Sequence, residues 1–167
     1  VLCATRTTAL NTMNCYVFNA ATPSLTANFP THLVPSPAPT GNNQDLAGAA
    51  VGAQNAGSFT LWLLYGGCAL YSTSTGFNGT NPANPALLPV TPALPNTCVD
   101  VAALPSGDVA VLTSTSVVRV TAAGAASPMV TGLNQPAGLD FAGGQLFVLD
   151  TGSQSVLRVT APATAPF

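Results

Sequence analysis

The chain has 167 residues, of which 47% are hydrophobic and only 5% are charged, and its three Arg and five Asp, without any Lys or Glu, give a net charge of −2. This length fits a single domain with a substantial core. So few basic residues exclude a phosphate-neutralising surface, so we expect no nucleic-acid partner and no attraction to anionic lipid. The longest apolar run, residues 59–71, is far shorter than a membrane-spanning helix and contains a Gly-Gly pair, so we expect no membrane span.

The cysteines and the first residue favour an exported protein. The chain begins at Val1 rather than Met, which predicts a processed N-terminus and an extracellular or cell-surface location. Four Cys fit two disulfides, although four buried thiols in a cytosolic protein remain the alternative. A zinc site is not expected, because no CxxC is present and His32 is the only histidine.

In chain order, the sequence repeats a phrase of short β-rich runs. A small or polar residue followed by a four-residue, apolar-rich stretch starts at residues 14, 67, 116 and 155. Another β-rich run stands before each of these, at residues 1, 60, 109 and 146. A further candidate strand precedes the last three pairs at 45, 98 and 138, and short extended pieces follow the first three at 31, 86 and 127.

This order predicts four consecutive sheets with strands a, b, c and d. A four-stranded unit of roughly 40 to 50 residues is the blade period of a β-propeller, whereas a β-sandwich would not reuse one phrase four times. We therefore expect one all-β propeller domain over residues 1–167. The expected blades cover about residues 1–40, 41–92, 93–132 and 133–167, with c strands near 15–19, 68–72, 117–121 and 156–160.

The Ala-rich segment 46–56 is the best candidate for a helix, but Gly48 and Gly52 lie inside it and Gly57 follows it. Glycine weakens a helix interior, so we expect a strand here and no long helix elsewhere.

The last repeat carries a family resemblance. Residues 135–159, QPAGLDFAGGQLFVLDTGSQSVLRV, have a Pro-x-Gly-Leu, a Gly-Gly turn, an apolar strand ending in Asp-Thr-Gly and an apolar-Arg-apolar strand. This pattern resembles an NHL-type β-propeller repeat. The resemblance implies the fold and not an activity, because such propellers host binding, scaffolding and enzymatic functions.

The motif also has a physical interpretation. Gly143 and Gly144 allow the positive-φ turn between strands a and b. Asp150 and Thr151 are expected to bond to backbone in the b–c hairpin, with Gly152 supplying an unusual torsion.

Arg119 and Arg158 stand at matched positions of two c strands. We expect each Arg to tie adjacent blades by bonding to a carbonyl or to an Asp. The candidate carboxylates are Asp100, Asp140 and Asp150.

The first blade lacks a strand a, because the chain starts directly with a b strand. Three arrangements remain open: a three-stranded first blade, a strand lent by a neighbouring molecule, or a chain that is part of a larger ring. The expected disulfides are Cys3–Cys15, across the first hairpin, and Cys68–Cys98, although four Cys allow three pairings.

No residue set predicts catalysis, a cofactor or a metal. His32 has no partner for activation and is interpreted as a packing residue, and no Gly-x-Ser-x-Gly is present. The Asp residues suit structural roles better than calcium binding. Asn78 fits a turn better than a glycosylation site. Aromatic residues at alternating strand positions are expected in the core rather than stacked on sugars; they are Tyr16, Phe18, Trp62, Tyr65 and Tyr71.

Two functions follow. The first is an extracellular structural protein that assembles into a homopolymer such as a filament, sheath or surface layer, with Val1, Leu2, Pro166 and Phe167 at the contacts. The second is a secreted propeller that binds a glycan or a protein through loops 35–44 and 74–97. An enzyme ranks third, because the single His and the absence of Glu leave little for a metal site.

Overall fold

The computed structural model describes residues 2–7, 12–19, 24–29, 46–55, 58–76, 88–90, 94–95 and 97–160. Side chains are described for residues 46–52, 60–65, 67–72, 90, 94–95 and 97–160. In these ranges the chain forms β-strands and one short 3₁₀ turn, η1 (Gly66–Cys68), and no α-helix. Also within these ranges, no helix has the length and hydrophobicity needed to cross a membrane.

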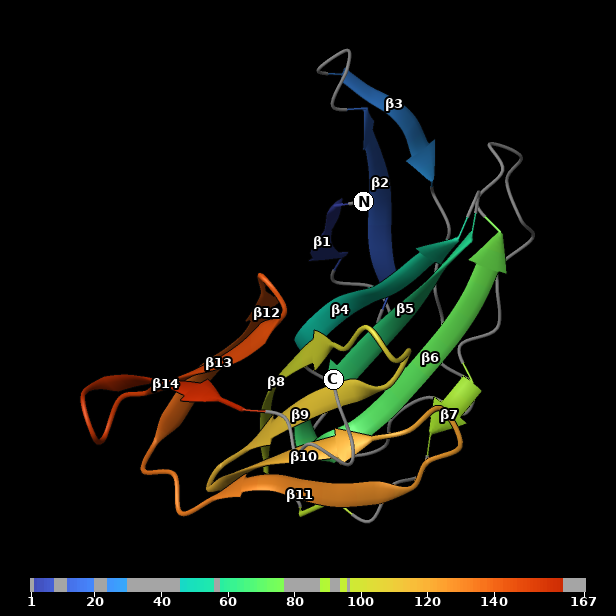
Figure 1. Ribbon diagram of the computed structural model, residues 1–167. Helices are drawn as coiled ribbons and strands as arrows, with labels where there is room; N and C mark the ends of the chain where they lie inside the picture. Colours follow the sequence, from blue (N-terminus) through green and yellow to red (C-terminus); the bar gives the residue numbers. More distant parts are fainter. Residues whose placement is uncertain are drawn as a thin grey trace.

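The strands form four antiparallel sheets, each made of consecutive strands (Figure 1). The first contains β1 (Leu2–Thr7), β2 (Thr12–Asn19) and β3 (Ser24–Phe29). The second contains β4 (Leu46–Asn55), β5 (Ser58–Tyr65), β6 (Ala69–Gly76) and β7 (Leu88–Val90). The third contains β8 (Cys98–Ala103), β9 (Val109–Thr113), β10 (Ser116–Val120) and β11 (Ala126–Thr131). The fourth contains β12 (Pro136–Ala142), β13 (Gln145–Asp150) and β14 (Ser155–Val159).

The all-β architecture of consecutive three- and four-stranded sheets is confirmed. Residues 46–55 of the candidate helix 46–56 form strand β4, as expected, and residue 56 lies outside the described residues. The extended piece expected at 31–36 lies outside the described residues, and the strand that pairs with β2 in the first sheet is β3 at Ser24–Phe29. A closed ring of sheets is not seen among the described residues.

The last three sheets repeat one register. The first strand of each carries a one-residue register shift, between Leu46 and Gly48, between Cys98 and Asp100, and between Pro136 and Gly138. Because the shift has the same place in each sheet, Gly48, Asp100 and Gly138 are equivalent positions. The repeat seen in the sequence is therefore also a repeat of backbone geometry.

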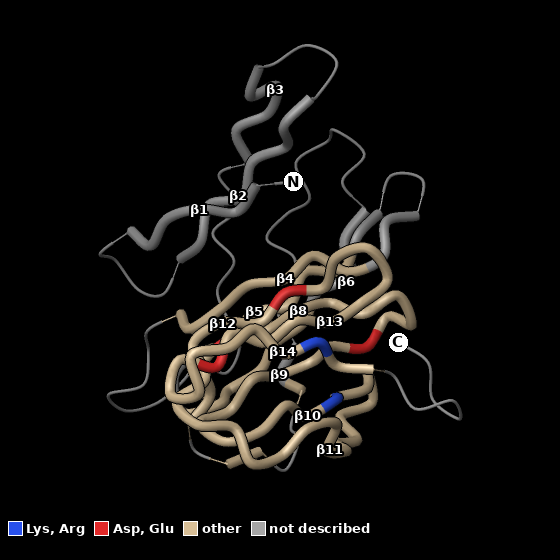
Figure 2. The backbone as a smooth tube through the Cα atoms, turned by 60° about the vertical axis from the view of Figure 1, so that its left-hand side comes forward, with Lys and Arg blue, Asp and Glu red and all other residues tan. Residues whose placement is uncertain are grey.

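Two hydrophobic clusters join these three sheets in series. Figure 2 traces the backbone of these sheets and marks their few charged residues. One is built from the β4–β7 and β8–β11 sheets, with Trp62, Leu64 and Leu70 facing Val109 and Val111. The other is built from the β8–β11 and β12–β14 sheets. Alternate residues of β9 enter the two clusters, since successive side chains of a strand point to opposite faces. Strand β9 of the β8–β11 sheet is thus buried on both faces.

A disulfide adds a covalent tie between two sheets. Cys68 in η1 is bonded to Cys98, the first residue of β8, with the two Cα atoms 5.0 Å apart. One of the two expected bridges is therefore present. For the other, the register of β1 and β2 sets Cys3 opposite Cys15, while their side chains lie outside the described residues.

Candidate functional site

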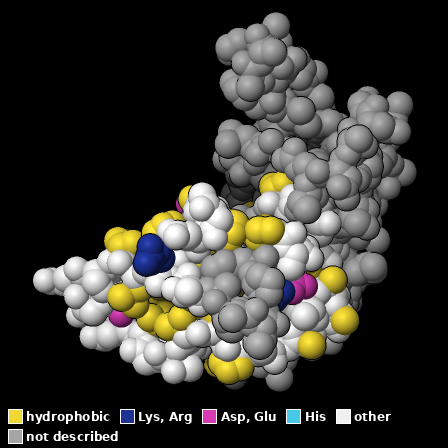
Figure 3. Space-filling model, in the orientation of Figure 1, with side chains coloured by type: hydrophobic (Ala, Val, Ile, Leu, Met, Phe, Trp, Pro, Cys, Tyr) yellow, Lys and Arg dark blue, Asp and Glu magenta, His cyan; other side chains and the backbone are white. Residues whose placement is uncertain are grey.

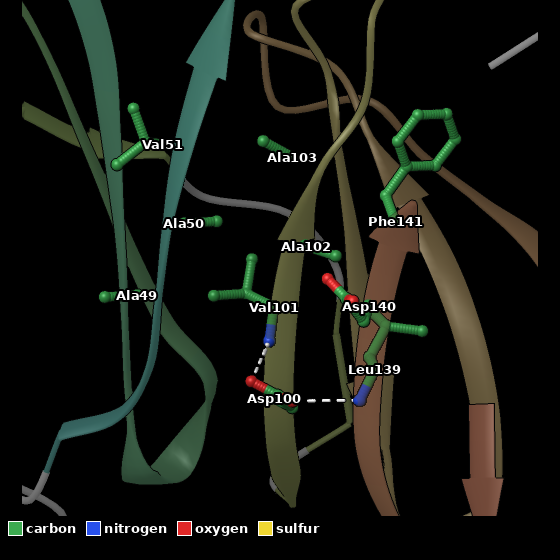
Figure 4. A pocket seen from close by; sticks show the side chains of 10 residues that line it. All are labelled: Ala49, Ala50, Val51, Asp100, Val101, Ala102, Ala103, Leu139, Asp140 and Phe141. Carbon is green, nitrogen blue, oxygen red and sulfur yellow. Dashed lines mark hydrogen bonds between the residues drawn. The ribbon is translucent and has the colours of Figure 1, made fainter. Parts of the chain in front are cut away.

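The first strands of three successive sheets line one groove. β8 lies beside both β4 and β12, and a cavity of about 300 Å³ opens along the three strands (Figure 4). Ala and Val make up most of its wall, and its charged groups are Asp100 and Asp140. Figure 4 shows Asp100 on β8 between the other two strands.

Both carboxylate oxygens of Asp100 are held by backbone. Oδ1 accepts a hydrogen bond from the N–H of Val101 at 2.8 Å, and Oδ2 accepts one from the N–H of Leu139 in β12 at 2.9 Å. The second bond joins β8 to β12, so Asp100 ties two adjacent sheets without an arginine. Among the described residues, no group of three or more His, Cys, Asp or Glu is placed to hold a metal ion.

Gly48 on β4 lies against the carboxylate of Asp100. A Cβ on Gly48 would lie 2.8 Å from Asp100 Oδ1 and 3.1 Å from the backbone nitrogen of Val101. Only glycine fits here without displacing the carboxylate or the β8 backbone. At this repeated position the three sheets therefore carry one carboxylate, Asp100, and two glycines, Gly48 and Gly138.

Asp150 has a different role from the one expected. It is buried, and both its oxygens accept the N–H of Asn134 at 3.1 Å, in the segment before β12. The register explains this partner, because Asp150 lies opposite Pro136 at the end of β13. Thr151 likewise donates to the carbonyl of Gln135.

The torsions of this hairpin also differ from expectation. Gly143 and Gly144 have the expected positive φ, 58° and 79°. In the b–c hairpin, however, the positive φ belongs to Gln154, at 52°, and not to Gly152. Gly152 is instead required by packing, since a Cβ there would collide with Asn134.

The partner of Arg119 was not among the expected carboxylates. Its Nε donates to Asp108 Oδ2 at 2.7 Å and its guanidinium also bonds to Ser106, so this ion pair lies within one sheet. Arg119 stands opposite Ala110, two residues after Asp108, which makes the β8–β9 turn the nearest source of a carboxylate.

Arg158 is exposed and, among the described residues, has no ion-pair partner. The turn that corresponds to the Asp108 turn is Gly143-Gly144, which has no carboxylate. Asp140 lies in the same cross-strand row, but β13 separates the two, about 9–10 Å at ordinary strand spacing.

One face of the β12–β14 sheet exposes apolar side chains. We call forward face the side of each sheet that points to the next sheet along the chain. On this face Leu64 and Leu70 of the second sheet and Leu112 and Val117 of the third are buried, at 1% exposure or less. The equivalent pair of the fourth sheet, Leu149 and Val156, is 45% and 66% exposed. Hydrophobic side chains accordingly gather at the surface over β12–β14, beside a basic one (Figure 3).

The aromatic residues of the β5–β6 hairpin belong to the core, as expected. Trp62, Tyr65 and Tyr71 are buried, and the two tyrosine rings meet edge to face with centroids 5.6 Å apart. Burial, and to a smaller extent Tyr71, raises the pKa of Tyr65 to about 12, and burial also raises the pKa of Tyr71. Both phenols therefore stay protonated at neutral pH.

Several sites predicted from sequence lie outside the described side chains. They are His32, Asn78, Tyr16, Phe18, Cys3, Cys15, Val1, Leu2, Pro166 and Phe167.

Comparison with known proteins adds no assignment, because no family model and no curated protein matches the chain.

Proposed function

We propose that the chain is a β-propeller of four blade-like sheets, of the NHL-like kind suggested by residues 135–160, and that it forms one domain over residues 1–167. Three observations support this. The last three sheets share one register shift, they pack in series through equivalent residues, and their first strands line a common groove. The blades in this proposal cover about residues 1–40, 41–92, 93–132 and 133–167.

We further propose that this domain is an extracellular, self-assembling structural subunit without enzymatic activity. The observation that carries this proposal is the exposure of Leu149 and Val156, at positions that are buried between sheets in both preceding repeats. In this proposal the ring of sheets is open after the fourth sheet, and such an exposed apolar face gains free energy when another sheet covers it. The disulfide between two sheets suits an oxidising compartment.

The termini supply the second contact of the proposed polymer. The first sheet has three strands, so β1 and β3 are its two edge strands, and an exposed strand edge is a template for strand addition. Deleting residues 161–167, which contain Pro166 and Phe167, should leave folded chains that no longer polymerise. Electron microscopy of the intact and the shortened chain tests this. A shortened chain that forms the same polymer overturns the terminal contact.

A binding module is the second candidate, and the groove favours it. The cavity places Asp100 and Asp140 among small side chains, and most of its accessible surface is polar, which suits a polar side chain or one sugar of a ligand. A glycan array and a pull-down with Asp140→Ala as the matched control would test this function. A chain that remains monomeric and binds a ligand through Asp140 would favour this candidate over the polymer.

A further inference from the structure

The forward face of the β12–β14 sheet carries two cross-strand rows whose members complement each other. The register places Asp140 on β12, Phe147 on β13 and Arg158 on β14 in one row. The next row holds Gly138, Leu149 and Val156. One row thus has an acidic residue at one end and a basic residue at the other, and the second row has a glycine at one end and a branched side chain at the other.

We propose that this face pairs with the same face of a second copy of the chain, about a twofold axis parallel to β13. This proposal deepens the proposed self-assembly and rests on it. Such an axis sets β12 of one copy over β14 of the other, while β13 faces its own counterpart. Each Asp140 then meets the Arg158 of the second copy, and each Val156 lies over the second copy's Gly138.

The charges favour a second copy over an unrelated partner. Asp140 and Arg158 are both exposed, and in the described part of the chain neither has an ion-pair partner. Within one sheet they are too far apart to pair, whereas across the twofold axis the two ion pairs form together. A self-complementary patch of this kind is what an isologous interface requires.

Burial of apolar side chains would provide most of the attraction between the two copies, and their two sheets would pack face to face with their strands aligned. Phe147 and Leu149 lie on the middle strand and so pack near the axis, with the two ion pairs on either side of Phe147 and the contacts between Val156 and Gly138 on either side of Leu149. A three-stranded face is smaller than the roughly 800 Å² per partner of a standard interface, so the pair by itself is weak. Because a twofold contact closes at two copies, a polymer also needs the contact at the termini.

Complementary charge reversal tests the twofold pairing directly. In Asp140→Arg both ends of the row are positive, and in Arg158→Asp both are negative. Each variant alone opposes like charges twice across the axis, whereas a one-to-one mixture of the two restores both pairs. Analytical ultracentrifugation of the full-length chains should show that each variant associates about tenfold or more weakly than wild type and that the mixture recovers wild-type association.

The controls separate this proposal from the proposed function. Ala123→Arg adds a positive charge in an exposed turn between β10 and β11 and should associate like wild type. Circular dichroism verifies that every variant is folded. If wild type associates but the mixture does not recover association, or neither variant is weakened, the twofold face is wrong and self-assembly stands. If wild type is monomeric at every concentration, both the proposed self-assembly and the proposed twofold pairing are wrong.

Discussion

The Asp100 carboxylate accepts the backbone N–H of Leu139 at 2.9 Å, and this one hydrogen bond joins the first strands of two successive sheets. The bond satisfies a partly buried backbone donor of β12. The Cys68–Cys98 disulfide joins the β8–β11 sheet to its other neighbour, the β4–β7 sheet. The β8–β11 sheet is therefore linked to both of its neighbours.

Replacing Asp100 should therefore destabilise the fold. In Asp100→Ala the Leu139 N–H loses its acceptor, and an unsatisfied partly buried donor costs about 1–3 kcal/mol. The free energy of unfolding from urea titration measures this change. Asp140→Asn, which alters an exposed carboxylate, is the matched control and should change the unfolding free energy by less than about 0.5 kcal/mol. Equal effects of the two variants would contradict the role of Asp100.

Gly48 should tolerate no side chain, whereas Gly138 at the equivalent position should. Gly48→Ala sets a Cβ 2.8 Å from Asp100 Oδ1, and such overpacking costs about 1–3 kcal/mol. In Gly138→Ala the nearest atom to the new Cβ is 3.9 Å away, an ordinary contact, so that variant should be close to neutral.

A double-mutant cycle identifies the carboxylate as the cause. The cost of Gly48→Ala should fall in the Asp100→Ala background, since the closest atom has been removed, although the Val101 backbone remains near. Strictly additive effects would show that Gly48 is needed for another reason.

The disulfide should contribute substantially to stability. Cys68–Cys98 closes a loop across 30 residues of sequence, which corresponds to about 3–4 kcal/mol of denatured-state entropy. Cys98→Ser should lower the unfolding free energy by that amount, and treating wild type with a reductant should do at least as much. Peptide mapping without reduction should also link Cys3 to Cys15, and a Cys15–Cys68 peptide would refute both pairings.

Two equivalent leucines should respond differently to the same substitution. Leu112 is fully buried between sheets, so Leu112→Ala should cost about 2–5 kcal/mol of unfolding free energy. Leu149 is 45% exposed, so Leu149→Ala should cost less than about 1 kcal/mol and should instead weaken association. Denaturation of dilute protein measures the first effect and light scattering of concentrated protein the second. A Leu149→Ala chain that associates like wild type would remove this face from the assembly.

Much of the fold could be predicted from the sequence because the repeat is local. Short apolar runs with turn residues between them predicted the order of the strands, and the Gly143-Gly144 pair predicted its hairpin turn. The aromatic residues of the β5–β6 hairpin were also recognisable as core, since they alternate along strands.

The contacts between sheets could not be predicted in the same way. The hydrogen bond between Asp100 and Leu139 depends on a register shift that cannot be recognised in the sequence. Its donor is a backbone N–H and not the expected arginine. The partner of Arg119 depends on which nearby turn carries a carboxylate, and here the β8–β9 turn supplies Asp108. The exposure of Leu149 and Val156 could not be predicted either, because the equivalent residues look alike in all three repeats and differ only in whether another described sheet covers them.

Sedimentation velocity of the intact protein over a concentration series measures whether the chain associates with itself. We expect association that grows with concentration and weakens only slightly between about 0.1 M and 1 M salt, because apolar contacts supply most of the attraction and few charges are screened. A single monomeric species at the highest concentration, in low and in high salt, would show that the chain does not self-associate.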